Sequence, residues 1–177
     1  MHLNRDQLRS ALARIRPLVL DVDGVMTDAG IFFGANEELK RFDSRDGVGI
    51  KYLIRHNIAV AVITGRESDS AVRRCAELGI TEVHQRQVQK LPAFLDLLQR
   101  QGVASEEVAV MGDDLADLPM MRRAGIGIAV ADACADVRRH AHWVTRAKGG
   151  CGAIREAAEA ILKAKGLWAK LVEKYLA

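Results

Sequence analysis

The stretch LVLDVDGVMTDAG, residues 18–30, decides the fold and raises a chemical problem. Its apolar residues up to Val22 are typical of a short buried strand of a parallel sheet, and Gly24 is predicted to end that strand. Asp21 and Asp23, two positions apart on a strand, point to the same side of the sheet. Two carboxylates about 4 Å apart repel each other by roughly 4 kcal/mol at an effective dielectric constant near 20. We therefore expect the rest of the chain to supply a compensating positive charge.

Length and composition indicate one globular domain over residues 1–177. Hydrophobic residues make up 49% and charged residues 28% of the chain, which is enough apolar material for a sizeable core. The net charge of +3 is small and the basic residues are scattered, so nucleic acid is not an expected partner. No apolar run is long enough to suggest a membrane span, and the N-terminus lacks the apolar segment of a signal peptide. Three widely spaced cysteines without a CxxC pair favour a reducing compartment, and we expect a cytoplasmic protein.

Strand and helix signals alternate along the chain. Strands are predicted at residues 18–22, 58–65, 81–84, 108–114, 125–130 and 142–145. Helices are predicted at residues 4–15, 45–57, 67–78, 89–101, 115–124, 133–140 and 151–176, the last with a joint near Gly166. This order predicts an α/β fold with a Rossmann-like parallel sheet and helices on both faces. Residues 29–43 fit a β-hairpin flap with its turn at 34–36, and residues 151–177 form a helical tail.

Carboxylates gather at the predicted carboxyl ends of separate strands. In parallel sheets, ligands bind beyond these ends, so the side chains are expected to meet at one edge. They are Asp21, Asp23, Asp113 and Asp114 or Asp117. A cluster of hard oxygen ligands suits Mg²⁺, which would neutralise the carboxylates and keep them ionised. Asp21 is then a candidate nucleophile, and Asp23 a candidate general acid and general base.

A different interpretation is that these aspartates are helix N-caps. For Asp114 or Asp117 alone that interpretation is equally good. It does not explain the whole set, because a cap does not require two carboxylates on one side of a strand.

Groups that could bind a phosphate follow the second long strand and begin a later helix. Thr64, Gly65 and Arg66 lead directly into a predicted helix, whose N-terminus offers free N–H groups to an anion. Lys90 begins another helix and could neutralise a phosphoryl oxygen at the same edge. The alternative for Lys90 is a solvated lysine at the start of a helix.

Four segments resemble, in order, the motifs of the haloacid dehalogenase superfamily of phosphohydrolases: DVDGVMTD, VITGR, QK and GDDLADLP. Longer segments extend the resemblance to the family of 3-deoxy-D-manno-octulosonate 8-phosphate phosphatases, over about residues 15–162. They are RFDSRDGVGIKYL, ITGRESDSAVRRCAELGI and AVADACADVRRHAHWVTRAKGGCGAIREA. This resemblance implies a capless Rossmann-like fold, Mg²⁺ as cofactor and a homotetramer. It also implies a phosphoric monoester hydrolase that acts on a sugar-acid phosphate of lipopolysaccharide biosynthesis.

The same resemblance implies roles for individual residues. Asp21 would attack phosphorus and form an aspartyl-phosphate, while Asp23 would protonate the leaving sugar oxygen and then activate water. Asp113 would bind Mg²⁺ together with the Asp21 carboxylate and the Asp23 carbonyl. Asp114 and Asp117 would support the metal from close by. Thr64 and Lys90 would hold the phosphoryl group.

The chain departs from the family pattern at two places. The third motif, GQSxK in the family, reads RQVQK here, with Arg86 and Gln89 at the unusual positions. The family's GGRGA reads GGCGA, so Cys151 stands where an arginine able to pair with a sugar carboxylate is expected. Candidates to replace that charge are Arg86, Arg66, Arg45 and Lys148. With Gly65, the three arginines form the predicted substrate-binding set.

The spacing leaves no room for an inserted cap domain. Only the hairpin fits between Asp28 and Arg45, and one helix and one strand fill the interval from Gly65 to Lys90. A bare site excludes water poorly, so the substrate is macromolecular or a neighbouring subunit covers the site. The apolar residues 31–33 of the hairpin favour a subunit interface, and the alternative is that they pack on their own domain.

Several functions therefore stand open. The favoured function is hydrolysis of 3-deoxy-D-manno-octulosonate 8-phosphate, and the nearest alternative is the same chemistry on a sialic-acid-type 9-phosphate. A phosphatase for macromolecules and a non-catalytic assembly module with the same fold are the others.

Overall fold

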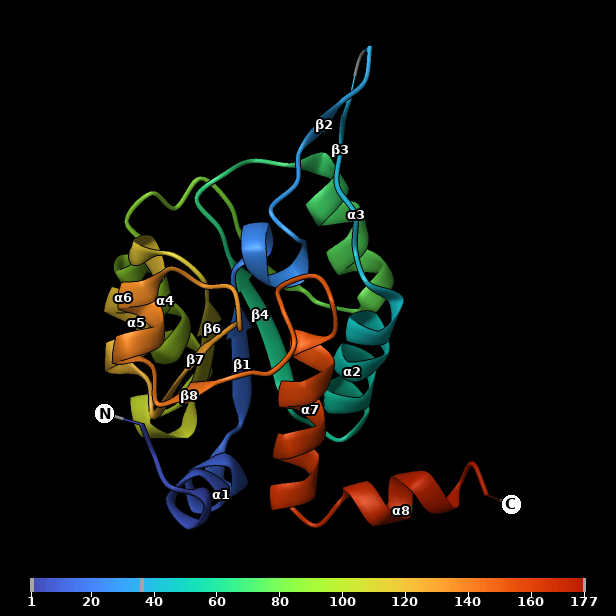
Figure 1. The fold of residues 1–177 in the computed structure, drawn as a ribbon, viewed down its shortest axis with the longest axis vertical. Coiled ribbons are helices and arrows are strands. Elements are labelled where there is room, and N and C mark those ends of the chain that lie inside the picture. Colours follow the sequence, from blue (N-terminus) through green and yellow to red (C-terminus); the bar gives the residue numbers. More distant parts are fainter. Residues whose placement is uncertain (1, 36, 177) are drawn as a thin grey trace.

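The computed structural model describes residues 2–35 and 37–176 (Figure 1). Six strands form a parallel sheet: β1 (Pro17–Leu20), β4 (Ala59–Ile63), β5 (Glu82–His84), β6 (Ala109–Gly112), β7 (Ile126–Ala129) and β8 (Trp143–Val144). Their order across the sheet is β5-β4-β1-β6-β7-β8. The predicted α/β fold with a parallel sheet is confirmed.

Helices cover both faces of the sheet. They are α1 (Arg5–Arg14), α2 (Ser44–Arg55), α3 (Asp69–Leu78), α4 (Lys90–Gln101), α5 (Leu118–Arg123), α6 (Ala135–His140), α7 (Ala153–Ala164) and α8 (Trp168–Glu173). Figure 1 shows α2, α3 and α7 on one face and α4, α5 and α6 on the other. Helix α1 packs against α7, and α8 extends away from the body of the domain. No helix among the described residues combines the length and the apolar character needed to cross a bilayer.

The centre of the sheet is built from the most apolar strands. All residues of β1, β6 and β7 are buried, as the continuous runs of branched side chains predict. Leu20 of β1 pairs with Val62 of β4 on one side and with Met111 of β6 on the other. Residues that follow β4, β1 and β6 therefore emerge side by side at one edge of the sheet.

Most helix ends match the local signals. Asn4 caps α1 and exchanges hydrogen bonds with Gln7, while Gly79 and Gly102 end α3 and α4 in the left-handed conformation. The helix predicted at 115–124 is divided into a short 3₁₀ turn, Leu115–Asp117, and then α5. The reason is Pro119, which has no N–H to continue the turn and favours the first positions of a new helix.

The predicted hairpin flap consists of β2 (Phe32–Phe33) and β3 (Glu38–Leu39), which pair in antiparallel fashion. It projects beyond the edge of the sheet (Figure 1). Asn36 of the predicted turn lies outside the described residues. Phe32 is 57% and Phe33 81% exposed, so both side chains are largely open to solvent.

Candidate active site

The chain turns directly after β1. The strand ends at Leu20, and a wide turn over Val22–Met26 is closed by the Thr27 N–H, which donates to the Val22 carbonyl at 3.0 Å. Gly24 within this turn has φ +87°, a conformation that favours glycine. The prediction that Asp21 and Asp23 share one side of a strand is therefore wrong, because strand alternation does not apply in the turn.

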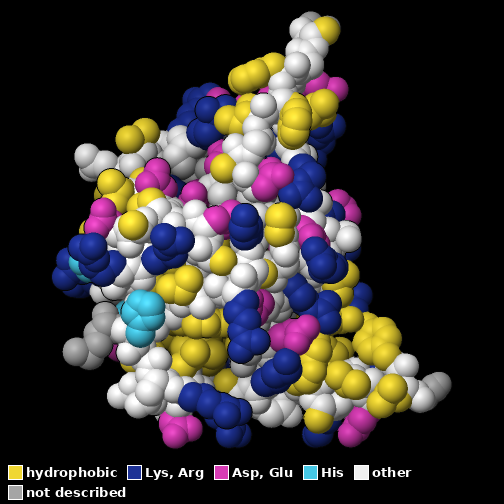
Figure 2. Space-filling model, in the orientation of Figure 1, with side chains coloured by type: hydrophobic (Ala, Val, Ile, Leu, Met, Phe, Trp, Pro, Cys, Tyr) yellow, Lys and Arg dark blue, Asp and Glu magenta, His cyan; other side chains and the backbone are white. Residues whose placement is uncertain are grey.

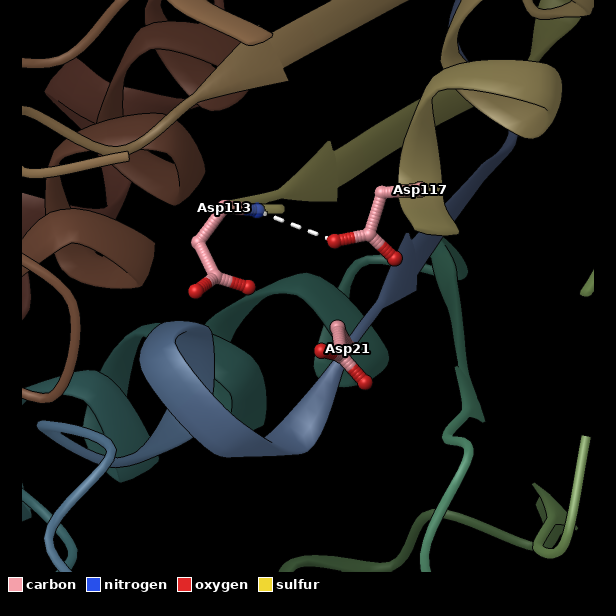
Figure 3. A group of neighbouring side chains, drawn as sticks. All are labelled: Asp21, Asp113 and Asp117. Carbon is pink, nitrogen blue, oxygen red and sulfur yellow. Dashed lines mark hydrogen bonds between the residues drawn. The ribbon is translucent and has the colours of Figure 1, made fainter. Parts of the chain in front are cut away.

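Three carboxylates meet at this edge (Figure 3). Asp21 follows β1, Asp113 follows β6, and Asp117 ends the 3₁₀ turn after β6. One oxygen of each lies within 4.8 Å of the other two. Asp117 is fully buried and Asp21 is 7% exposed. The sheet thus brings together carboxylates that are 92 and 96 residues apart in the sequence.

Asp117 is the best-anchored member of the group. Its Oδ2 accepts hydrogen bonds from the backbone N–H groups of Asp113 at 3.0 Å and Asp114 at 3.3 Å. Its Oδ1 lies 2.6 Å from the Lys90 ammonium. A Cβ placed on Gly112 would lie 2.4 Å from the Asp117 Cβ, so this approach requires glycine at position 112. Asp117 is therefore more than a helix cap.

Lys90 supplies part of the positive charge that we expected to compensate the clustered carboxylates. It is the first residue of α4 and is 4% exposed, so the solvated alternative is wrong. Its Nζ lies 2.8 Å from Asp21 Oδ1 as well as 2.6 Å from Asp117 Oδ1. Burial opposes its charge, but the two carboxylates raise the pKa of Lys90 above its ordinary value. The side chain is therefore an ammonium at neutral pH.

Burial and mutual repulsion disfavour the ionised forms of Asp113 and Asp21. Burial first, and then repulsion from Asp117 and Asp21, raise the pKa of Asp113 to about 7. Burial and Asp117 likewise raise the pKa of Asp21 to about 6, although Lys90 opposes this shift. Asp21 Oδ1 is buried without a well-directed hydrogen bond, even though the Lys90 ammonium lies beside it. The group therefore carries more negative charge than its surroundings neutralise.

Asp114 stands outside this group. Its side chain is exposed and accepts a hydrogen bond from the Leu115 N–H at 2.8 Å. This is the N-cap geometry, so the capping interpretation is confirmed for Asp114.

The carboxylate of Asp23 also lies outside the group of three. It forms an ion pair with Lys40 of the hairpin, and its Oδ2 lies 3.6 Å from Arg66 Nε. The backbone beside it approaches the site closely, since a Cβ on Gly24 would lie 2.1 Å from Asp113 Oδ2. The Asp23 side chain therefore faces Lys40 and Arg66, whereas the backbone of the turn at Gly24 faces Asp113.

Thr64 is correctly expected at the edge, but the helix that follows begins later than predicted. Thr64 comes directly after β4 and is 3% exposed, next to the strand that delivers Asp21. Helix α3 starts only at Asp69, and the Ser68 hydroxyl accepts from the Ala71 N–H. The prediction that residues 64–66 lead directly into a helix N-terminus is therefore wrong. The intervening residues 65–68 form a loop around the end of β4.

The predicted substrate-binding arginines are engaged in ion pairs. Arg66 Nη2 lies 2.6 Å from Glu38 Oε2, and Arg45 Nη2 lies 2.7 Å from its own helix cap, Asp43. Arg86 pairs with Glu67. Of the three, Arg66 alone also contacts a predicted catalytic side chain, Asp23.

Sequence reasoning missed two hairpin residues, Lys40 and Arg41. Arg41 Nη2 lies 3.3 Å from Cys151 Sγ and 2.7 Å from Asp28 Oδ2. The loop that carries Cys151 packs on the turn after β1, because the Gly150 N–H donates to the Val25 carbonyl at 2.9 Å. A guanidinium thus lies beside the position where the resembling family has its arginine. The adjacent pair of basic residues was the available signal, but its target depends on how the hairpin folds back.

Comparison with known proteins adds independent findings. A model of the haloacid dehalogenase-like hydrolases matches residues 76–154. The 3-deoxy-D-manno-octulosonate 8-phosphate phosphatase of Escherichia coli strain K12 is 50% identical over 153 residues, which are 86% of this chain and 81% of that protein.

Solved structures agree in fold. The phosphatase of the same name from Yersinia pestis superposes with a TM-score of 0.91 at 46% identity, over 93% of this chain and 89% of that one. The Moraxella catarrhalis phosphatase, solved in complex with magnesium ion, phosphate ion and KDO, gives a TM-score of 0.95 at 35% identity. That match covers 97% of this chain and 99% of the other.

Proposed function

Because this chain belongs to the family of 3-deoxy-D-manno-octulosonate 8-phosphate phosphatases, within the haloacid dehalogenase-like hydrolases, we propose that it hydrolyses that sugar-acid phosphate to the free sugar acid and inorganic phosphate. The observation that carries the proposal is the group of Asp21, Asp113 and Asp117 around Lys90, at the carboxyl edge of the sheet. Its donors are those that phosphoryl transfer through an aspartate requires.

The donor set fits Mg²⁺. Three carboxylates offer oxygens within 4.8 Å of one another, and the raised pKa of Asp113 marks negative charge that its neighbours do not compensate. Asp21 and Asp113 would hold the ion, together with the carbonyl of Asp23. Both oxygens of Asp117 are already engaged, so Asp117 would support the site from behind. When bound, the ion would neutralise charge on these carboxylates and on the phosphoryl oxygens.

In the first half of the reaction, a carboxylate oxygen of Asp21 attacks phosphorus. The new bond from Asp21 to phosphorus forms as the bond from phosphorus to the sugar oxygen breaks. Asp23 donates its proton to that leaving oxygen, which departs as the alcohol. Lys90, fixed by Asp117, stabilises the charge on the transferring phosphoryl group, and Thr64 lies at the same edge to hold it.

In the second half, the aspartyl-phosphate on Asp21 is hydrolysed. The Asp23 carboxylate takes a proton from a water molecule, and the resulting hydroxyl attacks phosphorus. The bond between phosphorus and the Asp21 oxygen breaks, which releases inorganic phosphate and restores the free carboxylate. Asp23 is left protonated, ready for the next leaving group.

We also propose that the chain self-associates, as a homotetramer, so that neighbouring subunits cover these uncapped sites. Figure 2 shows hydrophobic side chains along the projecting hairpin, and the most exposed are Phe33 and Phe32. Apolar side chains on a projecting flap are typical of an interface. Light scattering on the purified protein tests this proposal. A monomer would contradict it, and Phe33→Ser is expected to reduce the assembled fraction.

The activity is tested by phosphate release from 3-deoxy-D-manno-octulosonate 8-phosphate in the presence of Mg²⁺. Asp21→Asn is expected to abolish release, whereas Asp96→Asn, on the exposed face of α4, is the matched control and is expected to retain it. A higher kcat/KM for a sialic-acid-type 9-phosphate would reassign the substrate while keeping the chemistry. Failure to release phosphate from any sugar phosphate would contradict the proposal and favour a non-catalytic module.

A further inference from the structure

Lys40 is a charged residue beside the site that neither bonds to phosphorus nor transfers a proton in the proposed reaction. It follows β3 directly, and its side chain has no exposed surface. Its Nζ forms an ion pair with Asp23 Oδ1 and lies 3.3 Å from Glu38 Oε1. A lysine side chain is almost never fully buried unless it is paired, so this contact differs from the surface ion pairs of the chain.

Lys40 belongs to a closed ring of four charges with alternating sign. Glu38 Oε2 lies 2.6 Å from Arg66 Nη2, and Arg66 Nε lies 3.6 Å from Asp23 Oδ2. The two oxygens of Asp23 therefore face two different cations. In the part of the chain that the structure describes, these are the charged groups in contact with the Asp23 carboxylate.

The ring joins three segments at the mouth of the site. Asp23 comes from the turn after β1, Arg66 from the loop after β4, and Glu38 and Lys40 from the hairpin. The base of the hairpin is also tied to the domain by the bridge between Thr27 and Phe42 and by the contacts of Arg41 with Asp28 and Cys151. The ring thus ties the hairpin to the domain and fixes the direction of the Asp23 carboxylate.

The two cations contribute unequally. Arg66 is 48% exposed and 3.6 Å from Asp23, and an exposed pair at that separation contributes little. Lys40 is buried and contacts both carboxylates of the ring. Without Lys40, only the exposed Arg66 among the described cations would contact both Asp23 and Glu38. Repulsion between the two carboxylates would then be poorly compensated and would turn the Asp23 side chain away.

We propose that Lys40 is a positioning residue that orients the Asp23 carboxylate toward the leaving-group oxygen. The inference rests on the proposed function, in which Asp23 donates a proton to that oxygen. Asp23 acts on the leaving group only in the first half of the reaction, and kcat/KM reports that half because it extends to formation of the aspartyl-phosphate. The role of Lys40 is therefore measurable through the leaving group.

Two substrates separate positioning from general structural damage. The sugar oxygen leaves as an alkoxide unless it is protonated, so its departure needs a correctly placed acid. The p-nitrophenolate leaving group is stable as an anion and needs none. A misplaced Asp23 therefore lowers kcat/KM for the sugar phosphate and leaves kcat/KM for p-nitrophenyl phosphate nearly unchanged. A distorted site lowers both.

The experiment compares Lys40→Met with wild-type enzyme on these two phosphates. We expect kcat/KM for the sugar phosphate to fall about 10- to 100-fold, and kcat/KM for p-nitrophenyl phosphate to fall less than about threefold. Lys40→Arg keeps a cation between the two carboxylates and is expected to recover most of the loss. Lys163→Met removes an exposed lysine of α7 and serves as the matched control.

The outcomes are distinct. Equal losses on both substrates, or no loss, would overturn the role of Lys40 while the proposed function stands. Wild-type enzyme inactive on both phosphates would overturn the proposed function and this inference with it. If Lys40→Met does not fold, Lys40→Gln takes its place and Lys40→Arg remains the variant expected to recover activity. A substrate-dependent loss in Lys40→Gln supports the inference, and its absence there contradicts it.

Discussion

A single methyl group added at Gly112 tests whether the position of Asp117 organises the site. Position 112 ends β6, and Gly112 does not have a positive φ, so Gly112→Ala introduces no backbone strain of the left-handed kind. The added Cβ would lie 2.4 Å from the Asp117 Cβ and 2.6 Å from its Oδ2. Carbon atoms in contact are normally about 3.5–4 Å apart, so one of the two residues must move by about 1 Å.

The contacts of Asp117 set the size of the effect. A shift of about 1 Å lengthens its 3.0 Å hydrogen bond from Asp113 and its 2.6 Å contact with Lys90 beyond useful range. Overpacking a core costs about 1–3 kcal/mol, and the weakened hydrogen bonds to a buried carboxylate place Gly112→Ala at the upper end. For a chain of this length, that corresponds to a fall in Tm of roughly 5–10 °C.

The effect on catalysis is expected to be larger than the effect on stability. Displacing Asp117 moves Lys90 and the backbone of Asp113 together, and misplacement of reacting groups by about 1 Å costs about 100-fold in rate. The assays are thermal unfolding and kcat/KM for phosphate release. Gly79→Ala is the control, because a Cβ there meets nothing within 4 Å. Its φ of +82° makes it cost about 1 kcal/mol of stability with unchanged kcat/KM. Unchanged Tm and kcat/KM in Gly112→Ala would refute the reasoning.

Two further predictions concern charge. The pKa of Asp113 is raised from 3.8 to about 7, so its contribution to the stability of the metal-free protein is present below pH 3.8 and is lost as the pH rises through about 7. In the presence of a chelator, the Tm of wild-type protein relative to Asp113→Asn should therefore fall as the pH rises from 3.8 to about 7. Added Mg²⁺ should restore the Tm of the wild-type protein near pH 7. A pH-independent difference in Tm would contradict the raised pKa of Asp113. Arg41→Ala should raise KM for the sugar-acid phosphate about tenfold and leave KM for p-nitrophenyl phosphate nearly unchanged, because the latter has no carboxylate. Adding Cys151→Arg to that variant should recover the loss, and equal changes in KM for both substrates would exclude a role in carboxylate binding.

The parts of the fold that local signals determine could be predicted from the sequence. Buried strands of branched residues, glycines at helix ends and the alternation of strands with helices each depend on nearby residues. The meeting of Asp21 and Asp113 could also be predicted, since carboxyl ends of neighbouring parallel strands must lie at one edge. This prediction depends on the order of the strands in the sheet. The alternation of strands and helices along the chain favours a sheet in which β1 lies between β4 and β6, as the structure has it.

The parts that depend on side-chain direction could not be predicted. The direction of Asp23 follows from a turn closed four residues further on and from a lysine on the hairpin. The contact of Arg41 with Cys151 joins residues 110 positions apart through two loops. The burial of Lys90 depends on the depth at which α4 begins, which no local pattern reports. In each case the missing information is the geometry of a loop rather than the identity of a residue.

The carboxylates at the catalytic edge can be recognised in the sequence, but their mutual repulsion costs folding free energy. Three carboxylates and one ammonium leave a charge of −2 when all are ionised, and residues 2–35 and 37–176 supply no second buried cation within that group. Lys90 is held between Asp21 and Asp117, so Asp113 bears the imbalance and its pKa rises. A divalent ion has the charge that restores neutrality, whereas a proton on Asp113 restores only half. The repulsion among Asp21, Asp113 and Asp117 is thus relieved when a divalent cation completes the site, and the affinity for that cation is the counterpart of the repulsion that the fold leaves unrelieved.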